Sequence, residues 1–179
     1  MIGSYRQIMY GDPADAFRPY DPRCPGIARR VEELIQTGLP GVPVEHVGST
    51  AIPGCAGKGV VDRMLTYAPG QLDVVRAGVE ALGFQLHLGI DPFPPTRPVY
   101  VGAWTEADEA FRLHLHLIPA GDPEVEAQRR FRDALRADPR LVADYVANKR
   151  AALFAGATDA VAYNRGKAHF ISGVIGDRS

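Results

Sequence analysis

The feature that most constrains this chain is a strict alternation of apolar and polar residues between Phe111 and Leu117. Successive side chains of a β-strand point to opposite faces, so Arg112, His114 and His116 share one face and the apolar residues share the other. The run predicts a strand with one face in a hydrophobic core. His114 and His116 would lie roughly 6.5–7 Å apart, close enough to act as metal ligands, acid–base groups or phosphate contacts. A solvated sheet face is the alternative interpretation.

A second strand is predicted over residues 59–67, where one carboxylate lies in a mostly apolar run. Alternation places Asp62 on the same face as Val60 and Met64, and Arg63 on the opposite face. A carboxylate in an apolar strand costs several kcal/mol unless it is paired, hydrogen-bonded or bound to a metal. Asp62 is therefore a candidate catalytic residue and a candidate metal ligand.

The segment between residues 45 and 58 carries residue types that suit a phosphate site. Gly48 lets the backbone approach a ligand closely because it has no Cβ. Ser49 and Thr50 supply hydroxyl and N–H groups that can face phosphate oxygens. Lys58 is one of three lysines among 20 basic residues, and its ammonium is more compact than a guanidinium. A plain turn between two core strands is the alternative.

Apolar spacing and turn residues divide the chain into a mixed first part and a helical last third. Asp138-Pro139 is a typical helix start, with Asp138 as N-cap. The predicted fold class is α+β (α/β-type), with a mixed sheet flanked by helices. Residues 1–25 are expected to form an irregular arm, and residues 26–179 a single domain. Helices are predicted over 27–39, 72–82, 124–136, 139–154 and 158–175, strands over 42–47, 59–67, 84–88, 99–104 and 111–118, a surface loop over 89–98 and an acidic turn over 105–110.

The helical third contains two Tyr-x3-Lys pairs, Tyr145 with Lys149 and Tyr163 with Lys167. Residues four apart lie on the same face of a helix. Two such pairs on neighbouring helices can line the rim of an anion site, and the four side chains are candidate ligand contacts. Solvated helix faces are the alternative interpretation.

Charge and hydropathy exclude several function classes. The net charge of −1 argues against non-specific nucleic-acid binding as the main role, because such binding needs a strongly basic surface. No apolar run is long enough to span a bilayer, and the first residues lack the pattern of a signal peptide. A cytoplasmic protein is expected, with a small phosphate-bearing ligand and, as a further option, a protein partner.

The assembled residues resemble the GrpB family, which is related to the nucleotidyltransferase superfamily. A similar domain is fused to some dephospho-CoA kinases. The resemblance covers roughly residues 15–175. It is carried by Glu45-His46-Val47-Gly48-Ser49-Thr50-Ala51-Ile52-Pro53-Gly54, Lys58, Asp62, residues 112–117, residues 131–136, Tyr145, Lys149, Tyr163, Lys167 and Phe170-Ile171.

The resemblance implies a nucleotidyltransferase-like fold. In active members of that superfamily a Gly-Ser turn holds the triphosphate, and two carboxylates separated by one residue hold two Mg²⁺ ions. Gly48 and Ser49 match the turn, and Asp62 matches the first carboxylate. Met64 stands in the second position, and a thioether is a poor ligand for Mg²⁺. A third carboxylate has no clear match, and His114 or His116 takes that region.

Two smaller departures add to this one. Gly59 follows the lysine where the family tends to have proline, and Arg63 follows the aspartate where it tends to have an apolar residue. The departures argue against the usual mechanism with two Mg²⁺ ions.

Three functions remain open. The first is nucleotide or phosphate binding with metal-assisted nucleotidyl or related transfer, in which Asp62 and His116 hold Mg²⁺ or Mn²⁺ and Asp62, His114 and His116 act catalytically. The second is a non-catalytic accessory module that kept the anion pocket. The third is a zinc-dependent hydrolase. The expected ligand contacts are His46, Gly48, Ser49, Thr50, Lys58, Arg112, Tyr145, Lys149, Tyr163 and Lys167.

Overall fold

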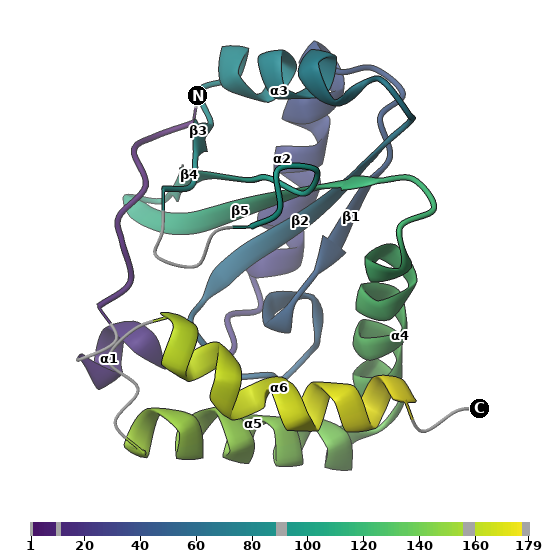
Figure 1. The fold of residues 1–179 in the computed structure, drawn as a ribbon. Helices are drawn as coiled ribbons and strands as arrows, with labels where there is room; N and C mark the ends of the chain where they lie inside the picture. Colours follow the sequence, from purple (N-terminus) through teal and green to yellow (C-terminus); the bar gives the residue numbers. More distant parts are fainter. Residues whose placement is uncertain (1, 10–11, 89–92, 156–159, 177–179) are drawn as a thin grey trace.

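The computed structural model describes residues 2–9, 12–88, 93–155 and 160–176. Its strands form one mixed sheet in the order β1-β2-β5-β4-β3, in which β2 and β5 are parallel and the other neighbours are antiparallel. The predicted fold class is confirmed, and Figure 1 shows the sheet between two groups of helices. The strands are β1 (Val44–Val47), β2 (Val60–Tyr67), β3 (Gln85–Leu86), β4 (Val99–Glu106) and β5 (Glu109–Pro119).

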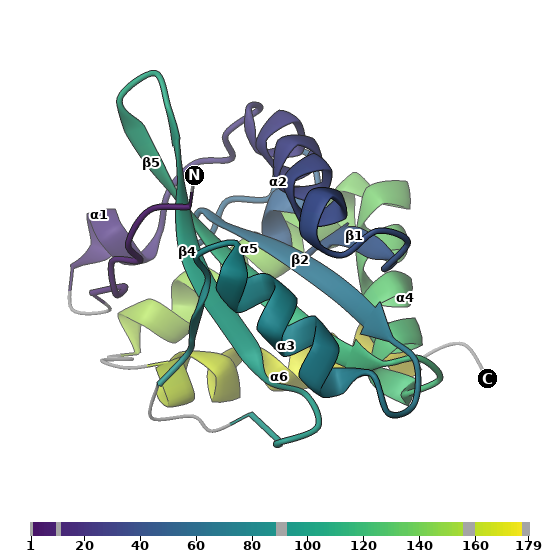
Figure 2. The same cartoon turned by 90° about the horizontal axis from the view of Figure 1, so that it is seen from above.

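One face of the sheet is covered by α2 (Cys24–Gly38) and α3 (Leu72–Ala81), as the view from above shows (Figure 2). In α2, Ile27, Val31 and Ile35 recur every four residues and are fully buried. They pack in the main core with the apolar faces of β2 and β5. Each such side chain contributes about 1.5–3 kcal/mol when it leaves water. The predicted apolar face of residues 111–117 therefore points toward α2 and α3.

The other side of the sheet carries α4 (Pro123–Ala137), α5 (Pro139–Phe154) and α6 (Ala160–Gly176). Figure 1 shows α5 and α6 below the sheet, with α3 above it. The predicted helical last third is thus present in the structure. The Asp138 side chain accepts a hydrogen bond from the Arg140 N–H, which confirms Asp138 as the N-cap of α5.

Several predicted boundaries were wrong by a few residues. The turn predicted over 105–110 contains only Ala107 and Asp108, both with positive φ, and the strands extend to the pair Glu106–Glu109. A two-residue turn of this kind matches the twist of the flanking strands, so the hairpin remains paired to its end. The strand predicted over 84–88 is only Gln85–Leu86, and α2 begins three residues earlier than expected. Residues 93–98 are irregular, as predicted, while 89–92 and the predicted helix start at 158 lie outside the described residues.

The N-terminal arm lies against the sheet. Gly3 bridges Ala103 of β4, and Arg18 bridges Gly57, while α1 (Pro13–Ala16) lies between these two bridges. Asp15 is buried and pairs with Arg112 of β5. The limits of the arm at 1–25 and of the domain at 26–179 remain predictions.

Candidate functional site

Three polar side chains from two adjacent strands meet on the face of the sheet opposite α2 and α3. The register pairs Asp62 with His114, and His116 follows two residues later on the same face. Oδ1 of Asp62 lies 3.1 Å from Nε2 of His116 and 3.6 Å from Nδ1 of His114. The three ligand atoms all lie within 4.8 Å of one another. Parallel pairing of β2 and β5 therefore builds this cluster directly into the backbone.

Burial and the contacts within the cluster shift the pKa values of Asp62 and His114. Burial alone would raise the pKa of Asp62, but the hydrogen bond from His116 and the electrostatic effects of His116, His114 and Lys58 outweigh it and lower the pKa. Burial lowers the pKa of His114 to about 3, although the Asp62 charge acts in the opposite direction. At neutral pH the cluster thus presents an ionised carboxylate and a neutral His114 imidazole.

Gly48 lies directly against the Asp62 carboxylate. Its φ of 70° and ψ of −172° belong to a region that only glycine adopts readily. A Cβ on residue 48 would overlap Oδ2 of Asp62 and come within 3.0 Å of its Cγ. The close approach that the sequence predicted for a ligand is therefore, in the structure, an approach to Asp62. The short 3₁₀ helix η1 (Ser49–Ala51) follows at once.

A cavity of about 890 Å³ opens in front of the cluster. The sheet contributes Asp62, His114 and His116, and the turn contributes Gly48 and Ser49. Helices and the loop before β2 close the opposite wall, so the structure brings most of the predicted site residues into one space. This wall includes Lys58, Phe131, Tyr145, Tyr163 and Lys167.

Two lysines face the same aromatic ring in this cavity. The Nζ atoms of Lys58 and Lys167 lie 5.2 and 5.0 Å from the centre of the Tyr163 ring. Burial, together with the charges of Lys58 and Lys149, lowers the pKa of Lys167 to about 7, while the charge of Asp62 acts in the opposite direction. A ring face next to ammonium groups offsets part of their mutual repulsion. An anion placed between the two lysines would offset the rest.

Lys149 is turned toward a loop instead. Its side chain is 1% exposed, and its Nζ donates to the Ala56 carbonyl and lies 3.3 Å from Sγ of Cys55. Burial lowers the pKa of this lysine as well. Lys149 thereby joins α5 to the loop after η1, and a Cβ on Gly57 would lie 2.9 Å from its Nζ.

His46, Thr50 and Arg112 lie apart from the cluster. His46 pairs with Arg63 on the face toward α2, and its Nε2 lies 3.0 Å from the Thr50 hydroxyl, which donates to the Val60 carbonyl. Burial and the charge of Arg63 lower the pKa of His46 to about 4. Arg112 shares the face of His114 but pairs with Asp15 of the arm. Thr50 and Arg112 line a second hollow of about 680 Å³ beside the arm.

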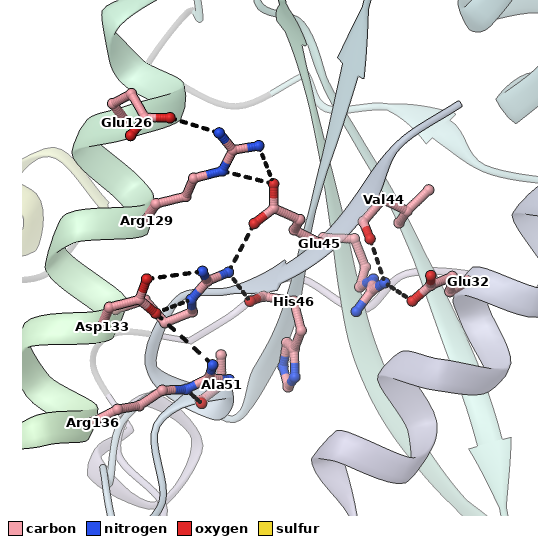
Figure 3. Close-up of polar contacts among 11 residues, drawn as sticks. Glu32, Val44, Glu45, His46, Ala51, Glu126, Arg129, Asp133 and Arg136 are labelled. Atoms are coloured by element: carbon pink, nitrogen blue, oxygen red, sulfur yellow. Dashed lines mark hydrogen bonds and ion pairs between the residues drawn. The ribbon is translucent and has the colours of Figure 1, made fainter. Parts of the chain in front are cut away.

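Three residues that shape the site could not be identified from the sequence pattern. The Tyr5 hydroxyl lies 2.9 Å from Nε2 of His114, and Asp15 holds the arm in place. Tyr5 lies outside any helix or strand and Asp15 lies in the four-residue helix α1, so neither segment shows a periodicity in the sequence. Glu45 accepts hydrogen bonds from Arg129 and Arg132 of α4, which Figure 3 shows. The acidic residue within the strand predicted over 42–47 and the arginine-rich helix were the available signals for this clamp.

The residues present do not fit a pair of Mg²⁺ ions. Met64, at the position of the second carboxylate, is 0% exposed and packs in a small core with Val47, Ile118 and Val125. Its side chain helps to anchor α4 to the sheet and offers no oxygen ligand. The site therefore departs from the two-metal arrangement in its packing as well as in its sequence.

The mixed sheet with its flanking helices has a nucleotidyltransferase-like fold. The family model described as "GrpB protein" matches residues 16–176, and the chain belongs to that family. A UPF0157 protein of Pseudomonas aeruginosa is 34% identical over 163 residues, which cover 88% of this chain and 65% of that protein. A dephospho-CoA kinase of Mycolicibacterium paratuberculosis is 31% identical over 156 residues, 75% of this chain and 38% of the kinase. The chain thus spans less than two thirds of these relatives.

Solved structures give the same fold. The GrpB protein of Enterococcus faecalis superposes with a TM-score of 0.72 at 20% identity, over 90% of this chain and 95% of the other. The Cid1 poly(U) polymerase gives a TM-score of 0.50 at 11% identity, over 72% of this chain and 41% of the other. Among the described residues, no helix is both long and apolar enough to cross a membrane.

Proposed function

We propose that this protein binds a nucleotide or another small phosphate-bearing ligand in the cavity beside Asp62. The observation that carries the proposal is the position of Lys58 and Lys167, which face one aromatic ring in the same cavity as the Gly48-Ser49 turn. Two neighbouring ammonium groups in a partly buried space repel each other, and an anion between them removes that repulsion. The phosphate groups would lie between the lysines and Ser49.

The remaining walls suit the nucleoside part. Phe93, Phe131 and Ile171 also line the cavity, and aromatic and aliphatic side chains form favourable contacts with a base. The volume of about 890 Å³ falls within the usual range of ligand pockets. The fold likeness to a poly(U) polymerase that was solved with Mg 3'-dATP supports a nucleotide as the ligand class.

A second candidate function is metal-assisted nucleotidyl or related transfer. The cluster of Asp62, His114 and His116 favours it, because an ion held there would face the bound phosphates. Transition-metal ions, Mn²⁺ among them, are to be tested beside Mg²⁺ for this reaction, and zinc-dependent hydrolysis is a lesser form of it. The buried Met64 favours binding without transfer, in a module that assists a partner protein. The match to 38% of a dephospho-CoA kinase supports this alternative. A cytoplasmic location would follow from either role.

Titration calorimetry tests the binding function. Nucleoside triphosphates are titrated into the protein with Mg²⁺ or Mn²⁺, and we expect binding that the Lys58→Met/Lys167→Met variant loses. Arg165→Met is the matched control, because Arg165 is an exposed cation on the same helix as Lys167. Absence of heat and of thermal stabilisation with every nucleotide would overturn the proposal. If Arg165→Met loses nucleotide binding to the same extent, the effect comes from the net charge of the protein and not from the two lysines.

Product analysis separates binding from transfer. The protein is incubated with a labelled nucleoside triphosphate, and pyrophosphate and transferred nucleotidyl groups are measured. A catalytic site predicts turnover that Asp62→Asn abolishes while nucleotide binding persists. A binding module predicts no product in either protein.

A further inference from the structure

The donor atoms around Asp62 are the wrong set for Mg²⁺ and a suitable set for a transition metal. One carboxylate oxygen and two imidazole nitrogens converge from β2 and β5. Mg²⁺ prefers oxygen ligands in octahedral geometry, whereas imidazole suits zinc, iron, nickel and copper. Met64, two residues after Asp62, is buried in a small core and offers no oxygen ligand. The side-chain donors next to Asp62 are therefore the ring nitrogens of His114 and His116.

The spacing of these donors matches one small ion. Zinc binds nitrogen and oxygen at about 2.0–2.2 Å, so two ligands of a tetrahedral ion lie roughly 3.4 Å apart. The distances from Oδ1 of Asp62 to the nitrogens of His116 and His114 are 3.1 and 3.6 Å. All three side chains are only partly exposed and project from paired strands, so little rearrangement is needed.

The surroundings of the donors hold them in a metal-binding orientation. The Tyr5 hydroxyl lies 2.9 Å from Nε2 of His114, which leaves Nδ1 facing Asp62. Metal-binding histidines typically use their second ring nitrogen in such a hydrogen bond. The Gly48 backbone lies against Oδ2 of Asp62, so Oδ1 is the oxygen that faces the two rings. The edge of the Phe93 ring packs against His116 at a centroid distance of 6.1 Å.

We propose that Asp62, His114 and His116 bind one divalent transition-metal ion, through Oδ1, Nδ1 and Nε2 respectively, with Tyr5 as a positioning residue. Three protein ligands leave a coordination position open toward the cavity, where water or a phosphate oxygen can bind. The inference deepens the proposed function, because the ion would lie in the same cavity as the phosphate-bearing ligand. It is tested with the ion alone.

Equilibrium dialysis with elemental analysis measures the binding. Protein stripped with a chelator is dialysed against Zn²⁺, Fe²⁺ or Mg²⁺, without nucleotide, and Co²⁺ serves as a spectroscopic probe. We expect one Zn²⁺ or Fe²⁺ per chain and no competition from Mg²⁺ in large excess. Comparison of the Zn²⁺ and Fe²⁺ arms identifies the preferred ion.

Variants locate the ion. Asp62→Asn and His116→Gln keep side-chain size and should lower the affinity about 100-fold or more, while Tyr5→Phe should lower it about tenfold. His169→Gln is the control, since it removes an exposed imidazole on α6. Unchanged circular dichroism and thermal midpoints of the metal-free proteins show that each variant folds.

The outcomes are distinct from those for the nucleotide. No stoichiometric ion in the wild-type protein, or full binding by Asp62→Asn and His116→Gln, overturns the metal site, as would an equal affinity for Mg²⁺. Nucleotide binding by a protein that takes up no Zn²⁺ or Fe²⁺ would leave the proposed function standing and this inference refuted.

Discussion

Gly48 is the residue whose replacement should be least tolerated. Its backbone angles are restricted to glycine, and a Cβ would overlap the carboxylate of Asp62. We expect Gly48→Ala to lower the free energy of unfolding by about 2–3 kcal/mol, because strain and displacement of Asp62 add together. Urea denaturation measures the loss, and the same variant should lose zinc and nucleotide binding.

Gly70→Ala is the matched control for this prediction. Gly70 also has a positive φ, 79°, but a Cβ there meets nothing within 4 Å. It should cost about 1 kcal/mol and leave ligand binding unchanged. Equal costs in the two variants would mean that the contact with Asp62 contributes nothing.

Lys167 should make ligand binding dependent on pH. Burial and the neighbouring lysines lower its pKa to about 7, so the amine is charged below that pH and increasingly neutral above it. An anion binds the charged form, and affinity should therefore fall between pH 7 and 9, by at most about tenfold per unit. Calorimetry across this range measures the slope.

The Lys167→Met variant tests the origin of that slope. It should bind more weakly at pH 7 and show little change between pH 7 and 9. A slope that persists in this variant would assign the titration to another group.

Single residues also show the limit of what the sequence predicts. The turn signal at Gly48 correctly indicated a close backbone approach, but the partner is a side chain 14 positions away in sequence, set by the β1–β2 pairing. The missing carboxylate at Met64 was visible in the sequence. Its burial in a small core was not, because packing depends on α4.

At the scale of elements, α4 is joined to β1 by the Glu45 clamp shown in Figure 3. Hydrogen bonds from Arg129, then from Arg132, lower the pKa of Glu45 against the effect of burial. Glu45→Gln should lower the free energy of unfolding by about 1–2 kcal/mol at pH 7. Because the folded pKa is lowered, this stabilisation is full above the unfolded pKa of about 4.3 and is lost as pH falls through the folded pKa.

Glu126→Gln provides the comparison for the clamp. Glu126 pairs with the same Arg129, but its side chain is 58% exposed. An exposed ion pair of this kind contributes less than about 1 kcal/mol. Urea denaturation of the wild-type protein and both variants at pH 7 and pH 3 measures these losses. If Glu45→Gln loses as much unfolding free energy at pH 3 as at pH 7, the electrostatic explanation is excluded.

The strands show why His46, an expected ligand contact, lies on the face of the sheet away from the cavity. Alternation shows which residues of one strand share a face. It does not show which of the two faces of β1 lies on the same side of the sheet as Asp62 of β2. The register pairs Val47 with Asp62 and His46 with Arg63, so His46 faces α2. In a four-residue strand a slip of one position would reverse this, and the sequence of β1 alone does not specify it. In the longer β5, by contrast, alternation predicted the shared face of His114 and His116.

At the scale of the whole molecule, the arm acts as a wall of the cavity. Asp15 is 4% exposed and binds Arg112, Arg6 and Arg18, and the hydrogen bonds of Met9, Arg112 and Arg6 lower its pKa against burial. Asp15→Asn leaves Arg112 buried without its counter-charge. We expect a loss of about 3 kcal/mol in the free energy of unfolding and faster tryptic cleavage of the arm.

Two further variants check the cause. Asp21→Asn removes a more exposed carboxylate of the same arm, which pairs with Arg23, and should cost less than about 1 kcal/mol. Adding Arg112→Met to Asp15→Asn should recover part of the stability, since no buried charge is then unpaired. If the double variant is no more stable than Asp15→Asn, the buried guanidinium is not the source of the loss.

The arm is also where prediction from the sequence reached its limit. The periodic segments predicted a mixed sheet and a helical last third, because burial of one face imposes a repeat on the sequence. An irregular arm carries no repeat, so the contacts of Tyr5 and Asp15 follow only from the assembled structure.

The parallel pairing of β2 and β5 has a consequence for how the chain is held together. His116 and Asp62 are 54 positions apart in sequence, and the intervening chain passes through α3, β3 and β4. An ion shared by the two strands would close that long loop, as a disulfide does in a secreted protein. Because such a metal cross-link is reversible, the rigidity of the sheet would depend on the supply of metal in the cell.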